Sequence, residues 1–169
     1  ESDLFFAYDV ASGKLLWQYR AEHSIRHNAI AIGQRYVYLI DRAQAVSDRV
    51  KRASAPVAQQ SGVLIALDKQ NGKLAWKRDT DIYGTTLAVS DAHGVVVMSY
   101  QNSRFKLDSE LGGRLTAFAT DSGETLWDRK ADYQSRLTLM DRTVVADGGA
   151  WDLLSGQPQE WKFSRSYGC

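Results

Sequence analysis

Short apolar runs separated by polar turns fill almost the whole chain. The run at residues 63–67 leads into a turn at Asn71-Gly72, and a second short run follows and ends on Trp76. Asn-Gly favours a tight hairpin turn because glycine adopts positive φ without steric cost. This alternation predicts β-hairpins, and no segment shows the sustained 3.6-residue period that is typical of a helix.

The hairpin recurs along the chain with fixed spacing. An Asp or Ala precedes three turn residues and a Gly, and Trp follows that Gly by four residues in three copies and by five in a weaker fourth copy. Repetition of this kind indicates architecture, so we assign these tryptophans to packing between repeated units. Trp151 lies off the pattern, and a role outside packing stays open for it. The repeat pairs are Gly13 and Trp17, Gly72 and Trp76, Gly123 and Trp127, and Gly156 and Trp161.

Two further strands fit between successive hairpins, for example at residues 29–32 and 36–40. A unit of four short antiparallel strands is the composition of a propeller blade. We therefore predict an all-β fold, a partial β-propeller of about three full four-stranded blades plus one half blade. Residues 1–169 form a single partial propeller domain, with an orphan outer hairpin at 1–21, blades at 22–80, 81–132 and 133–165, and insertions at 41–62 and 101–112.

The segment Ala66-Leu-Asp68-Lys-Gln-Asn-Gly72-Lys-Leu-Ala-Trp76 resembles the repeat of the quinoprotein-like (PQQ-like) β-propeller family. That family includes quinone-dependent alcohol dehydrogenases and the propeller lipoprotein that assists outer-membrane protein assembly. The resemblance implies an extracytoplasmic location, either periplasmic or secreted, and it specifies fold better than function because one fold hosts many functions. The tail at residues 165–169 also resembles a segment of bacterial members, which implies that the natural chain continues beyond Cys169.

Composition narrows the classes of function. Lys and Arg number 21 against 20 Asp and Glu, a net charge of +1, which does not favour nucleic acid as a partner because such binding neutralises many phosphates. The sequence holds no apolar run of about 18 residues that could span a membrane, and no signal peptide. Its one cysteine, Cys169, cannot form an internal disulfide, and the role of this thiol stays open.

We find no recognisable catalytic motif, and we name no catalytic residue, metal ligand or evident cofactor. The resemblance implies that the dehydrogenases of the family hold a quinone together with Ca²⁺, and Ca²⁺ requires clustered oxygen ligands. Adjacent cysteines, which several of those enzymes carry, are absent. We therefore expect PQQ and calcium as cofactors only if the chain is part of a dehydrogenase. The carboxylates in turns and insertions, which form no calcium signature, are Asp48, Asp79, Asp81, Asp108 and Glu110.

The three histidines give a weak signal for a metal. His23 and His27 flank Ile25 in a predicted loop that enters an inner strand, and a third ligand is missing, which disfavours a metal site. His93 lies beside Gly94 in a tight turn, where we expect it to be exposed.

The predicted loops gather at one end of the sheets. In a four-stranded meander, the connection between the second and third strands lies at the same end as the connection to the next blade. Long loops on a rigid scaffold commonly carry binding, although loops that are merely tolerated remain an equal alternative. The candidate binding face comprises His23, Arg26, His27, Asn28, Arg49, Lys51, Arg52, Tyr83, Thr85, Arg104, Tyr133 and Arg136.

Two functions stay open at this stage. The favoured hypothesis is a non-catalytic extracytoplasmic scaffold that binds a partner protein, peptide or polyanion through this face. The alternative is a fragment of a PQQ-dependent dehydrogenase that oxidises an alcohol or sugar, with its cofactor site partly outside this chain. An open arc of blades would expose apolar faces and strand edges, so we also expect self-association through those edges.

Overall fold

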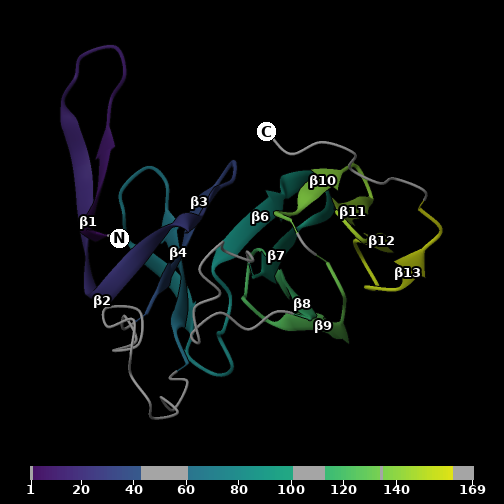
Figure 1. Ribbon diagram of the computed structural model, residues 1–169. Helices are drawn as coiled ribbons and strands as arrows, with labels where there is room; N and C mark the ends of the chain where they lie inside the picture. Colours follow the sequence, from purple (N-terminus) through teal and green to yellow (C-terminus); the bar gives the residue numbers. More distant parts are fainter. Residues whose placement is uncertain (1, 43–60, 101–112, 134, 162–169) are drawn as a thin grey trace, which may run out of the picture.

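A computed structural model describes residues 2–42, 61–100, 113–133 and 135–161, which form three antiparallel sheets that follow one another in chain order (Figure 1). The first sheet contains β1 (Ser2–Tyr8), β2 (Leu15–Ile32), β3 (Tyr36–Asp41), β4 (Val63–Asp68) and β5 (Leu74–Arg78). The second contains β6 (Thr86–Ser90), β7 (Val95–Ser99), β8 (Arg114–Ala119) and β9 (Thr125–Lys130). The third contains β10 (Thr138–Met140), β11 (Thr143–Ala146), β12 (Gly149–Asp152) and β13 (Pro158–Gln159).

These strands confirm the predicted all-β fold. Each sheet places its strands in sequence order, and every neighbouring pair is antiparallel, as a meander requires. The one helical segment among the described residues is a short 3₁₀ turn at Asp91–His93. β3 and β7 are buried along their whole length because each is a central strand covered on both faces, which explains their unbroken apolar character. No described helix is long and apolar enough to cross a membrane.

The expected loop at residues 21–28 is wrong, because these residues belong to β2, a single strand of 18 residues. The first part of β2 pairs with β1, and its last part pairs with β3 after a register shift between Ile25 and Ile30. Figure 1 shows β2 changing direction between these two partners. The predicted hairpin at 1–21 is therefore joined to the first sheet, and the proposed boundary between residues 21 and 22 falls inside a strand.

A buried carboxylate holds this part of β2 in place. The Asp41 side chain accepts backbone N–H bonds from Glu22 at 2.6 Å, from His23 at 3.0 Å and from Ser24 at 3.0 Å. Asp41 is itself almost fully buried, and a buried carboxylate is stable only where hydrogen bonds replace its water. The three bonds fix the backbone at the point where β2 passes from one partner strand to the other.

The repeated turns share one geometry. In the first turn the backbone N–H of Gly13 bonds to the carbonyl of Asp9 at 2.8 Å, and the Asp9 carboxylate accepts bonds from the backbone and hydroxyl of Ser12. The hydroxyl bond first, and then the backbone bond, lower the pKa of Asp9 below its ordinary value. Asp152 and Ser155 repeat the arrangement in the last turn. An Asp at this position thus stabilises the turn locally.

One kind of contact joins each repeat hairpin to the next, within the first sheet for Trp17 and between sheets for Trp76 and Trp127. The indole N–H of a repeat tryptophan donates to a backbone carbonyl in the following turn, and the ring lies directly over the glycine of that turn. A Cβ on that glycine would lie 2.5–2.7 Å from the ring, closer than atoms can approach. Three of the four repeat tryptophans thus pack over the glycine of the next turn, whereas Trp161 is 38% exposed. The indole donors and carbonyl acceptors are Trp17 to Lys69 at 2.9 Å, Trp76 to Thr120 at 2.8 Å, and Trp127 to Leu153 at 2.8 Å.

Trp151 also packs in the core, which closes the question left open for it. Its side chain belongs to the cluster between the second and third sheets, together with Val97, Leu115 and Trp127. The ring of Tyr133 meets it edge-on, with ring centroids 6.1 Å apart. The sequence did not reveal this because Trp151 occupies β12, one strand before the repeat position.

Candidate functional site

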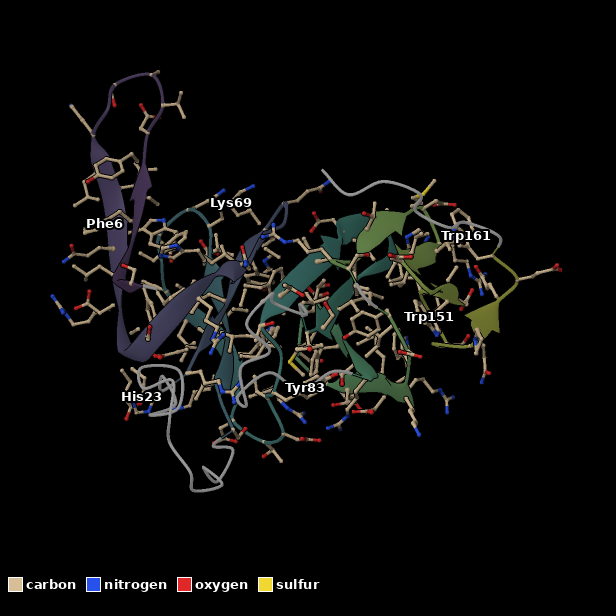
Figure 2. The ribbon with its side chains drawn as sticks, viewed as in Figure 1. Phe6, His23, Lys69, Tyr83, Trp151 and Trp161 are labelled. Carbon is tan, nitrogen blue, oxygen red and sulfur yellow. The ribbon has the colours of Figure 1, made fainter. Side chains whose placement is uncertain are left out.

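Residues 22–28 of β2 meet several strand ends and connections at one end of the sheets, which we call the loop end. Its other segments are residues 41–42, 61–62, 79–85, 99–100, 113–114, 130–133 and 135–137. Backbone bonds tie these segments together, from Arg42 to Ser24 at 2.9 Å and from Gly62 to Ile82 at 2.7 Å. Figure 2 shows His23 and Tyr83 on this side of the molecule, and Lys69 on the opposite side. The described residues on either side of the two predicted insertions, 41–42, 61–62, 99–100 and 113, therefore lie beside the connections between sheets.

Under the loop end lies a base of buried tyrosines. The hydroxyl of Tyr133 donates to the carbonyl of Arg114 at 2.8 Å and accepts the backbone N–H of Tyr100 at 2.9 Å. The hydroxyl of Tyr83 bonds to that of Thr116 at 3.1 Å. Each phenol thus links a connection between sheets to the strands below it, and this makes the base rigid.

Arg114 joins the base to the surface. Its guanidinium donates both to Asp128, at 2.9 Å, and to Asp81, at 3.0 Å, and it lies 4.8 Å above the ring of Tyr83. Hydrogen bonds to Asp128 and then to Asp81 raise the pKa of Arg114 above its already high value. Asp81, which we had considered as a loop carboxylate, is therefore engaged in an ion pair. An arginine held by two carboxylates and a ring serves to position the loop.

The outer rim of the loop end is polar. Arg136 donates to the side chain of Asn28 at 3.1 Å, which connects residues that are 108 positions apart in the chain. Arg42 is buried and donates to the carbonyl of Tyr83 at 3.0 Å. His23 and His27 are exposed on β2 beside this rim. The rim thus gathers cationic and amide side chains from the first sheet and from the connection between the second and third sheets.

The structure divides the predicted face into a base and a rim. Tyr83, Thr85 and Tyr133 lie in the base, where each is only 4% exposed and the side chain faces the interior. Arg26 is half-buried, whereas His23, His27, Asn28 and Arg136 are exposed. Sequence reasoning missed Arg114 and Asp41, because nothing in their local pattern marks a residue whose partners are distant in the chain. Four predicted face residues lie outside the described residues: Arg49, Lys51, Arg52 and Arg104.

The structure also shows the surroundings of His93 and of the described candidate carboxylates. His93, which we expected to be exposed, is 21% exposed, and its Nδ1 lies 3.0 Å from the hydroxyl of Ser90. Within the described ranges, no group of three or more His, Cys, Asp and Glu side chains could hold a metal ion. Asp48, Asp108, Glu110 and Cys169 lie outside these ranges.

Because the phenols of Tyr83 and Tyr133 are buried, we expect the free energy of unfolding to fall at alkaline pH. Burial raises the pKa of Tyr133 to about 12, and burial raises the pKa of Tyr83 as well. In the unfolded chain both phenols ionise near pH 10. The contribution of the two phenols to the free energy of unfolding is complete below about pH 10. It is lost as the pH rises towards their pKa values in the folded chain, because the unfolded chain releases these protons at lower pH. Urea titrations should show a free energy of unfolding that falls above about pH 10, by at most about 1.4 kcal/mol per pH unit for each phenol.

Tyr133→Phe is the matched variant for this test. It removes one ionising group, so the slope of stability against pH should become shallower, even though the lost hydrogen bonds lower stability at every pH. The difference in phenolate absorbance between the parent chain and the variant should show this tyrosine ionising near pH 12 in the folded chain and near pH 10 in the unfolded chain. A slope that is the same in the variant and the parent chain would contradict the assignment.

The comparisons with known proteins bear on this geometry. A family model described as outer membrane protein assembly factor BamB matches residues 6–157. The chain belongs to this family. The predicted membership in the PQQ-like propeller repeat family is thereby confirmed. No curated protein matches the sequence.

Solved structures extend the likeness to the fold. BamB from Moraxella catarrhalis has a TM-score of 0.65 and 22% identity, over 93% of this chain and 41% of that one. The quinohemoprotein alcohol dehydrogenase ADHIIG from Pseudomonas putida HK5 has a TM-score of 0.55 and 13% identity, over 92% and 31%. A europium-containing methanol dehydrogenase has a TM-score of 0.50 and 14% identity, over 92% and 26%. At these identities the likeness shows the fold alone, and it confirms the partial β-propeller. The chain spans less than half the length of each structure.

Proposed function

We propose that this chain is part of a non-catalytic extracytoplasmic scaffold whose loop end binds a partner protein or peptide during outer-membrane protein assembly. The observation that supports this most is the match of residues 6–157 to the family of an outer membrane protein assembly factor. We propose a periplasmic location, which the same membership supports. The polyanion that we considered from sequence remains a possible competitor for the cationic rim, and it is an outcome of the test below.

The loop end suits this role physically. Binding surfaces need a rigid base, since ordering mobile groups on association costs free energy. Here Tyr133 and Arg114 fix the base through hydrogen bonds, and Asp41 fixes the strand beside it. The exposed rim formed by Asn28 and Arg136 offers amide and guanidinium groups, which pair readily with backbone carbonyls and carboxylates.

The alternative remains a fragment of a quinone-dependent dehydrogenase. It rests on the fold that the chain shares with such an enzyme, at 13% identity. Titration with PQQ and Ca²⁺ separates the two functions. A spectral change together with dye-linked oxidation of an alcohol or sugar would favour the dehydrogenase, whereas the scaffold hypothesis expects neither.

Site-specific photocross-linking tests the scaffold directly. A photoreactive amino acid would replace His27 or Asp132, both exposed at the loop end, in the full chain inside the cell that produces it. Lys73, which is exposed at the opposite end, is the matched control. We expect cross-links from the two loop-end positions to a defined component or client of outer-membrane protein assembly, identified by mass spectrometry, and none from Lys73. Cross-linking to nucleic acid or polysaccharide would instead indicate a polyanion.

Two results would contradict the proposal. Equal cross-linking from Lys73 would show that the loop end is not the binding surface. Absence of protein cross-links from both His27 and Asp132, while the variants remain folded, would show that no partner protein binds there.

A further inference from the structure

Asn71 and Gly72 form an Asn-Gly pair in the turn between β4 and β5. Asparagine deamidates most readily before glycine, because glycine has no Cβ to hinder the attack of its backbone nitrogen on the asparagine side chain. Serine occupies the asparagine position in the other three repeat turns, as Ser12, Ser122 and Ser155. The turn between β4 and β5 is therefore chemically unlike its repeats.

Deamidation at this pair needs water and no other reactant. The backbone nitrogen of Gly72 attacks Cγ of Asn71 and closes a succinimide ring, and its proton leaves with the side-chain nitrogen as ammonia. Water then adds across one of the two C–N bonds of the ring. Cleavage at Cγ leaves an aspartate, whereas cleavage at the backbone carbonyl leaves an isoaspartate, which lengthens the main chain by a methylene group.

The folded turn holds both reacting groups in hydrogen bonds. The backbone N–H of Gly72 donates to the carbonyl of Asp68 at 2.8 Å, which retains the proton that must leave. Oδ1 of Asn71 accepts the backbone N–H of Lys73 at 2.9 Å, and the backbone N–H of Asn71 donates to the Asp68 carboxylate at 3.2 Å. While the turn is closed, the nitrogen is therefore a poor nucleophile, and the side chain is not free to turn towards it.

The ring of Trp17 keeps this turn closed. A Cβ on Gly72 would lie 2.7 Å from the ring, and the indole N–H donates to the carbonyl of Lys69, in the same turn, at 2.9 Å. Rotation of the backbone between Asn71 and Gly72 moves the glycine against the ring, so this contact must loosen before the succinimide can form. A reaction that needs a locally opened segment proceeds at a rate set by the population of the open form.

We propose that Asn71 is a deamidation site that the contact of Trp17 with Gly72 protects, so that the reaction proceeds only where this turn opens. The aspartate product keeps an acceptor for the N–H of Lys73. The isoaspartate product adds a methylene group between Asp68 and Lys73, which displaces the glycine from under the indole, so a chain modified in this way cannot restore the contact. This inference is independent of the loop end and of the proposed function.

Peptide mapping of the full chain after incubation at mildly alkaline pH tests the proposal. Mass spectrometry distinguishes amide from carboxyl at Asn71, and labelling by an isoaspartyl methyltransferase identifies isoaspartate. We expect Asn71 to react at least about 10-fold faster in urea than in the folded chain. Asn28, which is followed by Ala29, is the internal control and should react far more slowly than Asn71 in urea. Asn71→Ser should abolish the signal and retain the fold, because serine occupies this position in the other repeat turns.

Two tryptophan variants distinguish opening of this turn from a general loss of stability. Trp17→Ala uncovers Gly72 and should raise the rate at Asn71 in native buffer by about 10-fold or more. Trp127→Ala removes the same kind of contact at Gly156 but leaves the contact of Trp17 in place, so it should react like the parent chain. Circular dichroism selects a temperature at which both variants are folded.

Trp17→Phe keeps a ring over Gly72 but removes the N–H bond to Lys69, so it should react at a rate between those of the parent chain and Trp17→Ala. It serves in place of Trp17→Ala if the alanine variant does not fold. Three results would each overturn the proposal: an Asn71 that keeps its amide in urea, a folded parent chain that reacts as fast as the unfolded chain, and equal rates in the Trp17 and Trp127 variants.

Discussion

Replacing Trp127 by alanine should lower the free energy of unfolding by about 3–5 kcal/mol. The indole is 6% exposed, packs in the cluster between the second and third sheets, and donates its N–H to the carbonyl of Leu153 at 2.8 Å. Truncation therefore leaves a cavity between the sheets and an acceptor without its donor, and both effects destabilise. Urea denaturation followed by circular dichroism measures the change.

Trp161→Ala is the control for this measurement. The residue occupies the related repeat position, yet it is 38% exposed, so at a concentration where the chain is monomeric its removal should cost no more than about 1 kcal/mol. Equal losses from the two substitutions would mean that the buried contact over the glycine turn adds nothing to what a partly exposed tryptophan contributes.

The repeat could be predicted because the residues that define it are close together in the sequence. The spacing of Gly72 and Trp76 follows from a turn that needs positive φ and a strand that carries a large ring, and both requirements lie within five residues. The expected end of the strand at Trp76 is wrong, because β5 continues to Arg78. What the sequence could not show is that the indole covers the glycine of the next repeat rather than its own. That partnership joins Trp76 to Thr120, which is 44 residues away.

The path of β2 could not be predicted for a related reason. Polar residues such as His23 and His27 are typical of a loop, and local propensity favours that interpretation. The structure keeps them in a strand because the carboxylate of Asp41, 17–19 residues further along, binds three successive backbone N–H groups there. A tertiary contact has overridden the local pattern.

The sequence predicted which strand connections share one end of the sheets, but it did not predict which of their residues are buried. Strand alternation alone places the connections at one end, and the described flanks of the insertions lie there. Sequence gives no measure of burial within a loop, however, so Tyr83 and Tyr133 could not be distinguished from the exposed rim. Arg114 lies at the start of a strand, and only the fold brings it to Asp81 and Asp128.

Gly123→Ala should destabilise the chain by about 2–5 kcal/mol through two additive effects. Its φ of +70° is unfavourable for a residue with a Cβ, by about 1–2 kcal/mol. The new methyl group would also lie 2.5 Å from the ring of Trp76, and overpacking of this kind costs about 1–3 kcal/mol because the ring must move. The free energy of unfolding from urea titrations measures the sum.

Gly13→Ala separates the two effects, because Gly13 has nearly the same φ, +67°, and no described atom within 4 Å of the added group. At a concentration where the chain is monomeric, it should show the backbone strain alone, about 1–2 kcal/mol. The difference between the two substitutions then measures the contact between Trp76 and the turn of the next sheet. A difference near zero would mean that the indole moves aside at no cost, so that glycine at this place serves the turn and not the junction between sheets.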